Sequence, residues 1–219
     1  MKFYALIGSP RKHWNDDALT DKFIEGVKSV LSDAEIKKIY VYDLDFKGCH
    51  SCFGCKLKKN ETGECVIKDD IHDLLIDIRN SDGFVMASPI YFMDISGELR
   101  SFLERLMYPG PTKKELTIST IYTMNMTQEI FEDKMTPVIN FINAYFKANF
   151  HADEVDMITS FDTLQRKNND IYVPGHTDHD AKAARHEVQF PVDLQYAYDA
   201  GIRFANKAKN HQNLMKGMH

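Results

Sequence analysis

The chain has 219 residues, a hydrophobic fraction of 43% and a formal net charge of -5, values typical of one globular domain. Its 27 basic residues are outnumbered by 32 acidic ones, which excludes the basic surface expected of a nucleic-acid-binding domain. The amino terminus, MKFYALIGSPRK, has an apolar run too short for a signal peptide, and no apolar run elsewhere could span a membrane. We therefore expect a cytoplasmic protein whose four cysteines remain reduced.

Short apolar runs alternate with amphipathic stretches along the chain. The run KFYALI ends at Gly8, as expected of a buried strand, and Asn15 or Asp16 can cap the helical pattern that follows. Pro89 ends the third predicted strand, and Pro137 interrupts the fourth predicted helix. The predicted strands cover residues 2–7, 35–44, 83–88, 116–124 and 154–161, and the predicted helices cover residues 15–31, 69–82, 97–108, 128–149 and 193–210.

This alternation predicts an α/β fold, a doubly wound five-stranded parallel sheet with helices on both faces. We expect a single domain over residues 1–219, with a cysteine-containing loop at 48–65 and a C-terminal loop and helix at 165–210. Ligands in such folds bind beyond the carboxyl ends of the strands, where the strand order reverses. The loops after the first, third and fourth strands are therefore the candidate binding loops.

The loop after the first strand, GSPRKHWND, has the groups needed to hold a phosphate. It offers the Ser9 hydroxyl, the cations Arg11 and Lys12, and the amino terminus of the next helix. Asp16 and Asp17 oppose this interpretation, because carboxylates at a helix start compete with a phosphate for the same N–H groups. Either Asp16 turns outward as a cap, or the phosphate is held less tightly. A surface turn with a helix cap is the alternative.

The loop after the third strand begins SPIYFMDISG and places a stiff proline beside two aromatic side chains. Pro89, Tyr91 and Phe92 offer flat apolar surface against which an aromatic ring system can lie. The alternative is a loop that packs on its own sheet. Residues 122–125, after the fourth strand, would cover the opposite edge of the same pocket.

GSPRKHWND, the cysteine loop running into CVIKDD, and SPIYFMDISGELRSFLERL occur in this order at suitable strand ends. Together they resemble the flavodoxin-like NAD(P)H-dependent FMN reductases, a family that includes the iron–sulfur flavoproteins. The resemblance implies a flavodoxin-like fold and FMN as cofactor. Asp16 stands where the family has a phosphate-binding threonine. The residues that the resemblance places against FMN are Ser9, Arg11 and Asn15 at the phosphate, with Asp16 beside them, Pro89, Ile90, Tyr91 and Phe92 along the ring, and Thr123 and Met124 at its other edge.

The resemblance also implies the reaction. NAD(P)H is the co-substrate, and electrons pass through the bound flavin to a small acceptor such as a quinone or free flavin. Because the flavin carries the chemistry, no catalytic side chain is nominated. Relatives of this kind are dimers or tetramers, so a homodimer or homotetramer is expected. The alternatives are an iron–sulfur flavoprotein that transfers single electrons, and a non-catalytic flavodoxin-like binding protein.

The cysteine loop, GCHSCFGCKLKKNETGEC, leaves three interpretations open. Cys49, Cys52 and Cys55 are spaced closely enough to bind three corners of a 4Fe–4S cluster, and Cys65 is within reach as a fourth ligand. Zinc is the second interpretation and metal-free thiols are the third. The gap before Cys65 is longer than in compact ferredoxin motifs. We therefore expect metal-free thiols and name the four cysteines as ligands only for the case of a cluster.

Overall fold

The computed structural model describes residues 1–60, 62–167, 171–172 and 178–217, with the backbone alone for 214–217. A five-stranded parallel sheet in the order β2-β1-β3-β5-β6 forms its centre, which confirms the predicted fold class. A two-residue strand, β4, pairs antiparallel with the end of β3. The strands are β1 (Lys2–Ile7), β2 (Glu35–Tyr40), β3 (Gly83–Tyr91), β4 (Asp94–Ile95), β5 (Thr117–Thr123) and β6 (Val155–Ser160).

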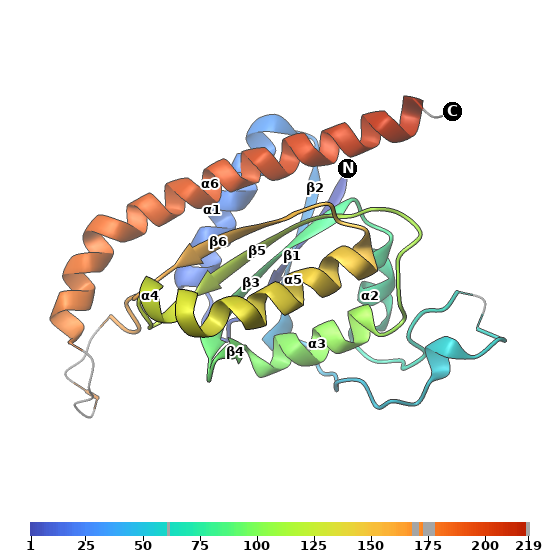
Figure 1. Ribbon diagram of the computed structural model, residues 1–219, viewed down its shortest axis with the longest axis horizontal. Coiled ribbons are helices and arrows are strands. Elements are labelled where there is room, and N and C mark those ends of the chain that lie inside the picture. Colours follow the sequence, from blue (N-terminus) through green and yellow to red (C-terminus); the bar gives the residue numbers. More distant parts are fainter. Residues whose placement is uncertain (61, 168–170, 173–177, 218–219) are drawn as a thin grey trace.

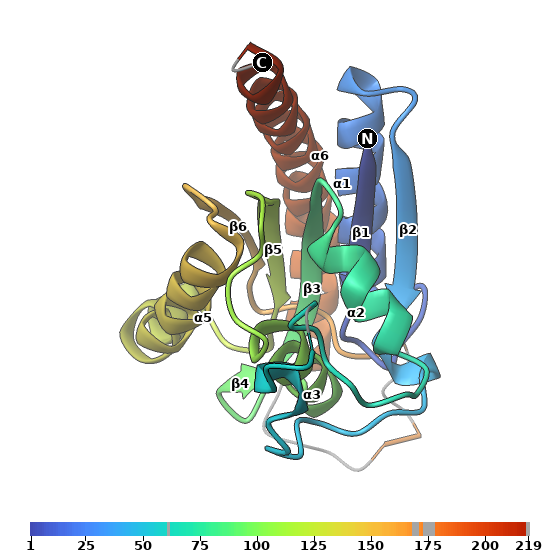
Figure 2. The ribbon, with the colours of Figure 1, turned by 90° about the vertical axis from the view of Figure 1, so that its right-hand side faces the viewer.

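Helices cover both faces of the sheet (Figures 1 and 2). On one face lie α1 (Asn15–Val30) and α6 (His179–Gly217), and on the other lie α2 (His72–Arg79), α3 (Gly97–Met107) and α5 (Thr136–Phe150). Each face has its own apolar core cluster. The backbones of α1 and α6 approach closely, because a Cβ at Gly26 would lie 2.0 Å from the Tyr198 carbonyl oxygen and one at Gly201 would lie 2.1 Å from that of Phe23. None of the described helices is long and apolar enough to cross a membrane.

Strand order positions the candidate loops. β1 lies between β2 and β3, so the chain reverses its direction of winding next to β1. Ile7 at the end of β1 pairs with Ala87 of β3, and Pro89 of β3 pairs with Thr123 of β5. The loops that leave β1, β3 and β5 are therefore neighbours at one edge of the sheet, as expected for ligand binding in a doubly wound fold.

The third strand is longer than the sequence predicts. β3 continues through Pro89 to Tyr91 and then turns back into β4. β1 ends opposite Ala87, so Pro89 lies beyond the part of β3 that is bonded on both sides. Its missing N–H therefore does not interrupt the centre of the sheet, and the prediction that the strand ends at this proline is wrong.

The last helix is also longer than predicted. α6 begins at His179 and continues through Pro191, although the sequence pattern predicts a start near residue 193. A proline inside a helix costs about 3 kcal/mol, but Phe190 and Leu194 on either side of it pack against the core cluster beneath α1 and α6. Part of the polar loop predicted before this helix, residues 168–170 and 173–177, lies outside the described residues.

The helix predicted over residues 128–149 is divided. A short α4 (Gln128–Ile130) leads into a π-helical turn, η3 (Phe131–Met135), and α5 follows. Pro137 lies in the first turn of α5, where a helix N–H has no intrahelical partner. The interruption was therefore predicted correctly. The remaining short elements are two 3₁₀ turns, η1 (Val41–Asp43) and η2 (Gly54–Lys56).

Candidate functional site

The loop after β1 runs tightly against the start of α3. Gly8 donates its N–H to the Ala87 carbonyl oxygen at 2.8 Å. A Cβ at Gly8 would lie 2.7 Å from Leu99 Cδ2 and 3.1 Å from Ser96 Oγ, so glycine permits this approach where other residues would clash. Ser96 Oγ is buried and has no hydrogen-bond partner among the described residues. The sequence motif does not point to Ser96, because only the fold brings α3 next to this loop.

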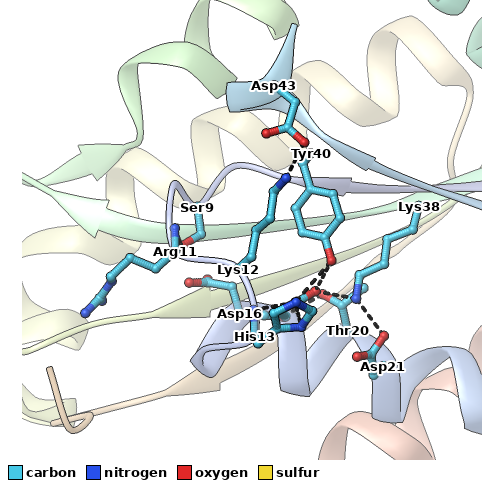
Figure 3. Close-up of polar contacts among 11 residues, drawn as sticks. Ser9, Arg11, Lys12, His13, Asp16, Thr20, Asp21, Lys38, Tyr40 and Asp43 are labelled. Atoms are coloured by element: carbon cyan, nitrogen blue, oxygen red, sulfur yellow. Dashed lines mark hydrogen bonds and ion pairs between the residues drawn. The ribbon is translucent and has the colours of Figure 1, made fainter. Parts of the chain in front are cut away.

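Asp16 is buried at the start of α1 and points into the site. Its side chain is directed toward Ser9 and Arg11, on the opposite side of the loop from Tyr40 and Lys38 (Figure 3). Thr123, at the end of β5, donates its hydroxyl to the Asp16 carboxylate, with 3.1 Å to either oxygen. Burial raises the pKa of Asp16 to about 7, even though Thr123, Arg11 and Ser9 each act to lower it. The carboxyl therefore takes up a proton far more readily near neutral pH than an ordinary aspartate does.

The neighbouring carboxylate, Asp17, stabilises the helix start. It accepts the backbone N–H of His13 at 2.6 Å and the Tyr40 hydroxyl at 3.0 Å, and it forms an ion pair with Lys38. Burial acts to raise the pKa of Asp17, but Lys38, the His13 N–H and Tyr40 together lower it. The expectation that Asn15 or Asp16 caps the helix is wrong, because Trp14 is the N-cap residue and no side chain makes a cap hydrogen bond there.

Carbonyl oxygens of a distant segment bind several donors of the β1–α1 loop. Leu164 O accepts from Trp14 Nε1 at 3.2 Å and from Asn15 Nδ2 at 3.1 Å. The Arg11 guanidinium donates to Gln165 O. A bound phosphate would present oxygen acceptors to the same kind of donors. Sequence pattern does not indicate this contact, because the donors and acceptors are about 150 residues apart in the chain.

The loop between β3 and β4 presents apolar surface beyond the sheet. Phe92 is fully exposed, and Tyr91 and Met93 are partly exposed. Phe92 and Met93 have left-handed backbones, with φ of 49° and 64°, which is uncommon outside glycine. Burial raises the pKa of Tyr91, against the effect of Arg11, so the guanidinium lies near the phenol.

The structure thus brings most of the predicted cofactor residues together. Ser9 follows β1, Asp16 lies at the start of α1 and Thr123 ends β5, and the three side chains meet at one point. Pro89 and Ile90 lead directly into the exposed loop. Met124 differs, because its side chain is buried in the core cluster beneath α3 and α5.

The residues present fit a phosphorylated flavin under one condition. Donors come from Ser9, from Arg11, from the first turn of α1 and from the Ser96 hydroxyl, which has no partner in the part of the chain that the structure describes. An ionised Asp16 would repel a phosphate among those donors, whereas a protonated Asp16 adds one more donor. The pKa of about 7 makes the protonated form accessible near neutral pH. The donor set therefore fits FMN when Asp16 carries its proton.

The four cysteines gather beside the C-terminal half of α3. Cys49, Cys52, Cys55 and Cys65 line one small cavity, together with Arg105 and residues of the adjoining segments. All four are free thiols, and burial raises the pKa of the Cys55 thiol. No three of the four sulfur atoms lie within 4.8 Å of one another. Tetrahedral zinc would hold thiolates about 3.8 Å apart, so the loop is not preformed for zinc.

The cysteine loop is attached to α3 by a buried arginine. Arg105 forms an ion pair with Asp69 and donates to the carbonyl oxygens of Lys47 and Ile67, each at 3.2 Å. Burial alone would lower the pKa of Arg105, but Asp69 and the adjacent Cys65 raise it. The sequence does not single out Arg105, because it belongs to an ordinary amphipathic helix pattern.

Within the loop, Asn60 donates to the carbonyl oxygens of Gly54 at 3.1 Å and Glu64 at 2.8 Å. It thereby holds the two segments that carry Cys55 and Cys65 together.

Comparison with known proteins connects this arrangement with flavoproteins. Residues 1–132 match the family model for NADPH-dependent FMN reductase. An iron-sulfur flavoprotein of Archaeoglobus fulgidus is 30% identical over 116 residues, which cover 52% of this chain and 50% of the relative. A second iron-sulfur flavoprotein from the same organism is 35% identical over 105 residues, 48% of each chain. The chain thus matches about half the length of these curated relatives.

Solved structures resemble the fold over nearly the whole chain. An NAD(P)H:quinone oxidoreductase from Methanothermobacter marburgensis has a TM-score of 0.63 at 15% identity, covering 92% of this chain and 96% of that one. An FMN-dependent NADH-azoreductase from Bacillus anthracis, solved with FMN, has a TM-score of 0.61 at 11% identity, covering 94% of this chain and 100% of that one. At such identities the likeness shows the fold alone. The matched family model, which spans more than half of the chain, shows that this protein belongs to the NADPH-dependent FMN reductase family.

Proposed function

We propose that the protein is an FMN-dependent NAD(P)H oxidoreductase that passes electrons to a small acceptor such as a quinone or free flavin. The observation that carries this proposal is the meeting of Ser9, Asp16 and Thr123 at the carboxyl edge of the sheet. Arg11 and the exposed Tyr91–Met93 segment lie beside them. FMN, when bound, supplies the redox chemistry.

The protein's own contribution is binding and orientation. Ser9, Arg11 and the amino terminus of α1 would hold the phosphate, and Thr123 would keep Asp16 in place. Because Arg11 and Asn15 now donate to the carbonyl oxygens of Gln165 and Leu164, the phosphate would displace these contacts. Tyr91 and Phe92 would lie along the ring and limit its contact with water.

The acceptor is proposed from the openness of this edge. Phe92 is fully exposed and its neighbour Met93 is partly exposed, so the loop does not close over the edge of the sheet. A flat, small acceptor can reach a ring lying there, as can the nicotinamide of NAD(P)H.

An apolar residue left exposed at such a site also suits contact with a second copy of the chain, and we propose a homo-oligomer.

A second function is favoured by the cysteine cavity. The four thiols line one cavity and have the buried Arg105 beside them, an environment that favours a negatively charged group. A 4Fe–4S cluster there would make the protein an iron–sulfur flavoprotein that transfers single electrons. The cavity lies at the C-terminal end of α3 and the flavin loops lie at its N-terminal end. Nine residues of helix separate Ser96 from Arg105, a rise of about 14 Å.

One purification distinguishes the two functions. The protein is purified without oxygen, its absorption spectrum is recorded, and flavin and iron are quantified on the same sample. A flavin spectrum without iron, bleached by NADPH or NADH, supports the reductase with free thiols. About four irons per chain, with absorbance that bleaches with dithionite, supports the cluster. The absence of any flavin affinity contradicts both and leaves a non-catalytic binding protein.

A pair of adjacent cations tests the proposed phosphate site. Arg11→Met should weaken FMN binding by about tenfold or more, because it removes a charge-assisted donor. Lys12→Met is the matched control, since Lys12 forms an ion pair with Asp43 at 2.6 Å and points away from Asp16 (Figure 3). Titration by flavin fluorescence measures both. Riboflavin, which lacks the phosphate, should bind the Arg11 variant as well as it binds the parent. Equal losses for the two variants would contradict the placement of the phosphate.

A further inference from the structure

A second cluster of ligating groups lies where the parallel strands begin, at the end of the sheet opposite the flavin loops. Glu115 precedes β5, Asp153 precedes β6, and His211 belongs to the C-terminal part of α6. One ligand atom from each lies within 4.8 Å of the other two. The fold therefore collects an imidazole and two carboxylates from three separate segments, far from the flavin loops.

The distances within this cluster suit a small divalent cation. His211 Nε2 lies 3.1 Å from Glu115 Oε1 and 3.7 Å from Asp153 Oδ2. Zinc bonds of about 2.0–2.2 Å place neighbouring ligands of a tetrahedron about 3.3–3.6 Å apart. Calcium requires six to eight oxygen ligands and magnesium an octahedron of oxygens, so one nitrogen and two oxygens favour zinc.

Two further contacts distinguish the cluster from an ordinary surface ion pair. Glu115 Oε1 is buried and accepts no hydrogen bond from the described residues, so the nearby imidazole is not aligned to donate to it. The other ring nitrogen, Nδ1, lies 3.3 Å from the Thr117 hydroxyl. A hydrogen bond at Nδ1 is what orients metal-binding histidines and leaves Nε2 free as the ligand.

The charge balance also leaves room for a cation. Among the described residues, the only ion-pair partner of Glu115 and of Asp153 is His211. The two neighbouring carboxylates carry two negative charges, which a divalent cation neutralises.

We propose that Glu115, Asp153 and His211 bind one zinc ion, which fastens the C-terminal part of α6 to the amino ends of β5 and β6. Water completes the tetrahedron, because the Asp153 side chain is exposed. Zinc here supports the structure and does not take part in electron transfer.

The test must separate this site from the thiols, which also bind zinc. The full chain with Cys49, Cys52, Cys55 and Cys65 replaced by serine is titrated with zinc by calorimetry. We expect one zinc per chain. His211→Gln and Glu115→Gln, made in the same background, should each weaken binding by at least about 100-fold, and Thr117→Val by about 10–100-fold. Glu35→Gln is the matched control, because this exposed carboxylate lies at the same edge of the sheet, at the start of β2.

Thermal unfolding gives a second measurement. Zinc at 100 times its Kd should raise the Tm of the serine-substituted chain by about 5–10 °C, and should leave the His211→Gln variant unchanged. Cobalt added to the wild-type chain should show absorption from nitrogen and oxygen ligation in addition to any thiolate bands. Absence of zinc uptake, or uptake that neither His211→Gln nor Glu115→Gln reduces, would overturn the proposal and leave a histidine–carboxylate ion pair.

Discussion

The β1–α1 loop and the cysteine loop are both marked by short sequence motifs, but the fold holds them in different ways. Ser9, Asp16 and Thr123 are almost fully buried between strand ends, so desolvation sets the chemistry of the first loop. The cysteines lie in a surface loop held by Arg105 and Asn60. Burial thus determines the protonation chemistry of the β1–α1 loop, whereas a few hydrogen bonds and one ion pair determine the position of the cysteine loop.

The largest expected effect comes from removing the attachment of the cysteine loop. Arg105→Met should lower the free energy of unfolding by about 3–5 kcal/mol, because Asp69 and two carbonyl oxygens lose their buried partner. Urea unfolding at pH 7 measures the change. Arg100→Met is the control on the same helix, since Arg100 pairs with Asp94 but is about one-third exposed, and should cost about 1 kcal/mol at most. Equal costs would show that Arg105 does not anchor the loop.

Adjacent carboxylates at the start of α1 should respond to pH with opposite signs. The pKa of Asp16 is about 7 in the folded chain and 3.8 for an ordinary aspartate, so the free energy of unfolding falls as the pH rises from about 4 to 7. Asp16→Asn removes this penalty. It should stabilise the flavin-free protein by on the order of 3–4 kcal/mol at pH 8 and have little effect at pH 4.

Asp17 has a lowered pKa, so its contribution is present above the ordinary aspartate value and is lost as the pH falls through its own lower pKa. Asp17→Asn should therefore destabilise the protein by about 1–3 kcal/mol at pH 7. Urea unfolding from about pH 2 to 8 compares the two variants, because the Asp17 contribution is lost only below the ordinary aspartate pKa. Destabilisation by Asp16→Asn at pH 8 would show that burial does not raise the pKa of this carboxyl.

FMN affinity should depend on the protonation of Asp16. If the phosphate binds only beside a protonated carboxyl, the Kd for FMN rises by up to about tenfold per pH unit above about pH 7. Asp16→Thr should abolish this dependence and tighten binding at pH 8 by about tenfold, because it removes a like charge and supplies a hydroxyl. Fluorescence titration between pH 6.5 and 8.5 measures both, with riboflavin as the phosphate-free control. Equal or weaker FMN binding by the threonine variant at pH 8 contradicts the repulsion argument.

The smallest effect is expected within the cysteine loop. Asn60→Ala removes two hydrogen bonds that join the Cys55 and Cys65 segments and should cost about 1 kcal/mol of global stability. Its local effect should be larger, seen as faster amide exchange in the loop and faster reaction of the thiols with a disulfide reagent. Thr62→Ala is the comparison variant, because it removes only the hydroxyl that donates to Asn60 Oδ1 and leaves in place both hydrogen bonds from the Asn60 amide to the loop, so it should have the smaller effect. Unchanged thiol reactivity in the Asn60 variant would show that the loop keeps its shape without this side chain.

The local sequence pattern was sufficient to predict a strand or helix where the burial of its residues follows a regular period. The buried strand at residues 2–7 and the helix at 97–108 were predicted almost to the residue, because apolar periodicity reflects burial on one face. It failed at Pro89 and Pro191, where packing and position in the sheet offset the ordinary effect of proline. The spacing of the cysteines could be recognised in the sequence, but the attachment of the cysteine loop to Arg105 could not.

The sequence by itself determined the fold class, the order of the strands and helices, and the loops that meet at the carboxyl edge of the sheet. These follow from hydrophobic periodicity and from the rules of parallel sheets. Only the tertiary structure decided that Asp16 faces inward, that Asp17 accepts the His13 N–H just before the helix, and that Leu164 and Gln165 cover the β1–α1 loop. Only the structure likewise joined Glu115, Asp153 and His211. The physical reason is that desolvation and hydrogen bonding between distant segments depend on which side chains lie next to one another in the folded chain. The spacing of residues in the sequence does not specify these neighbours.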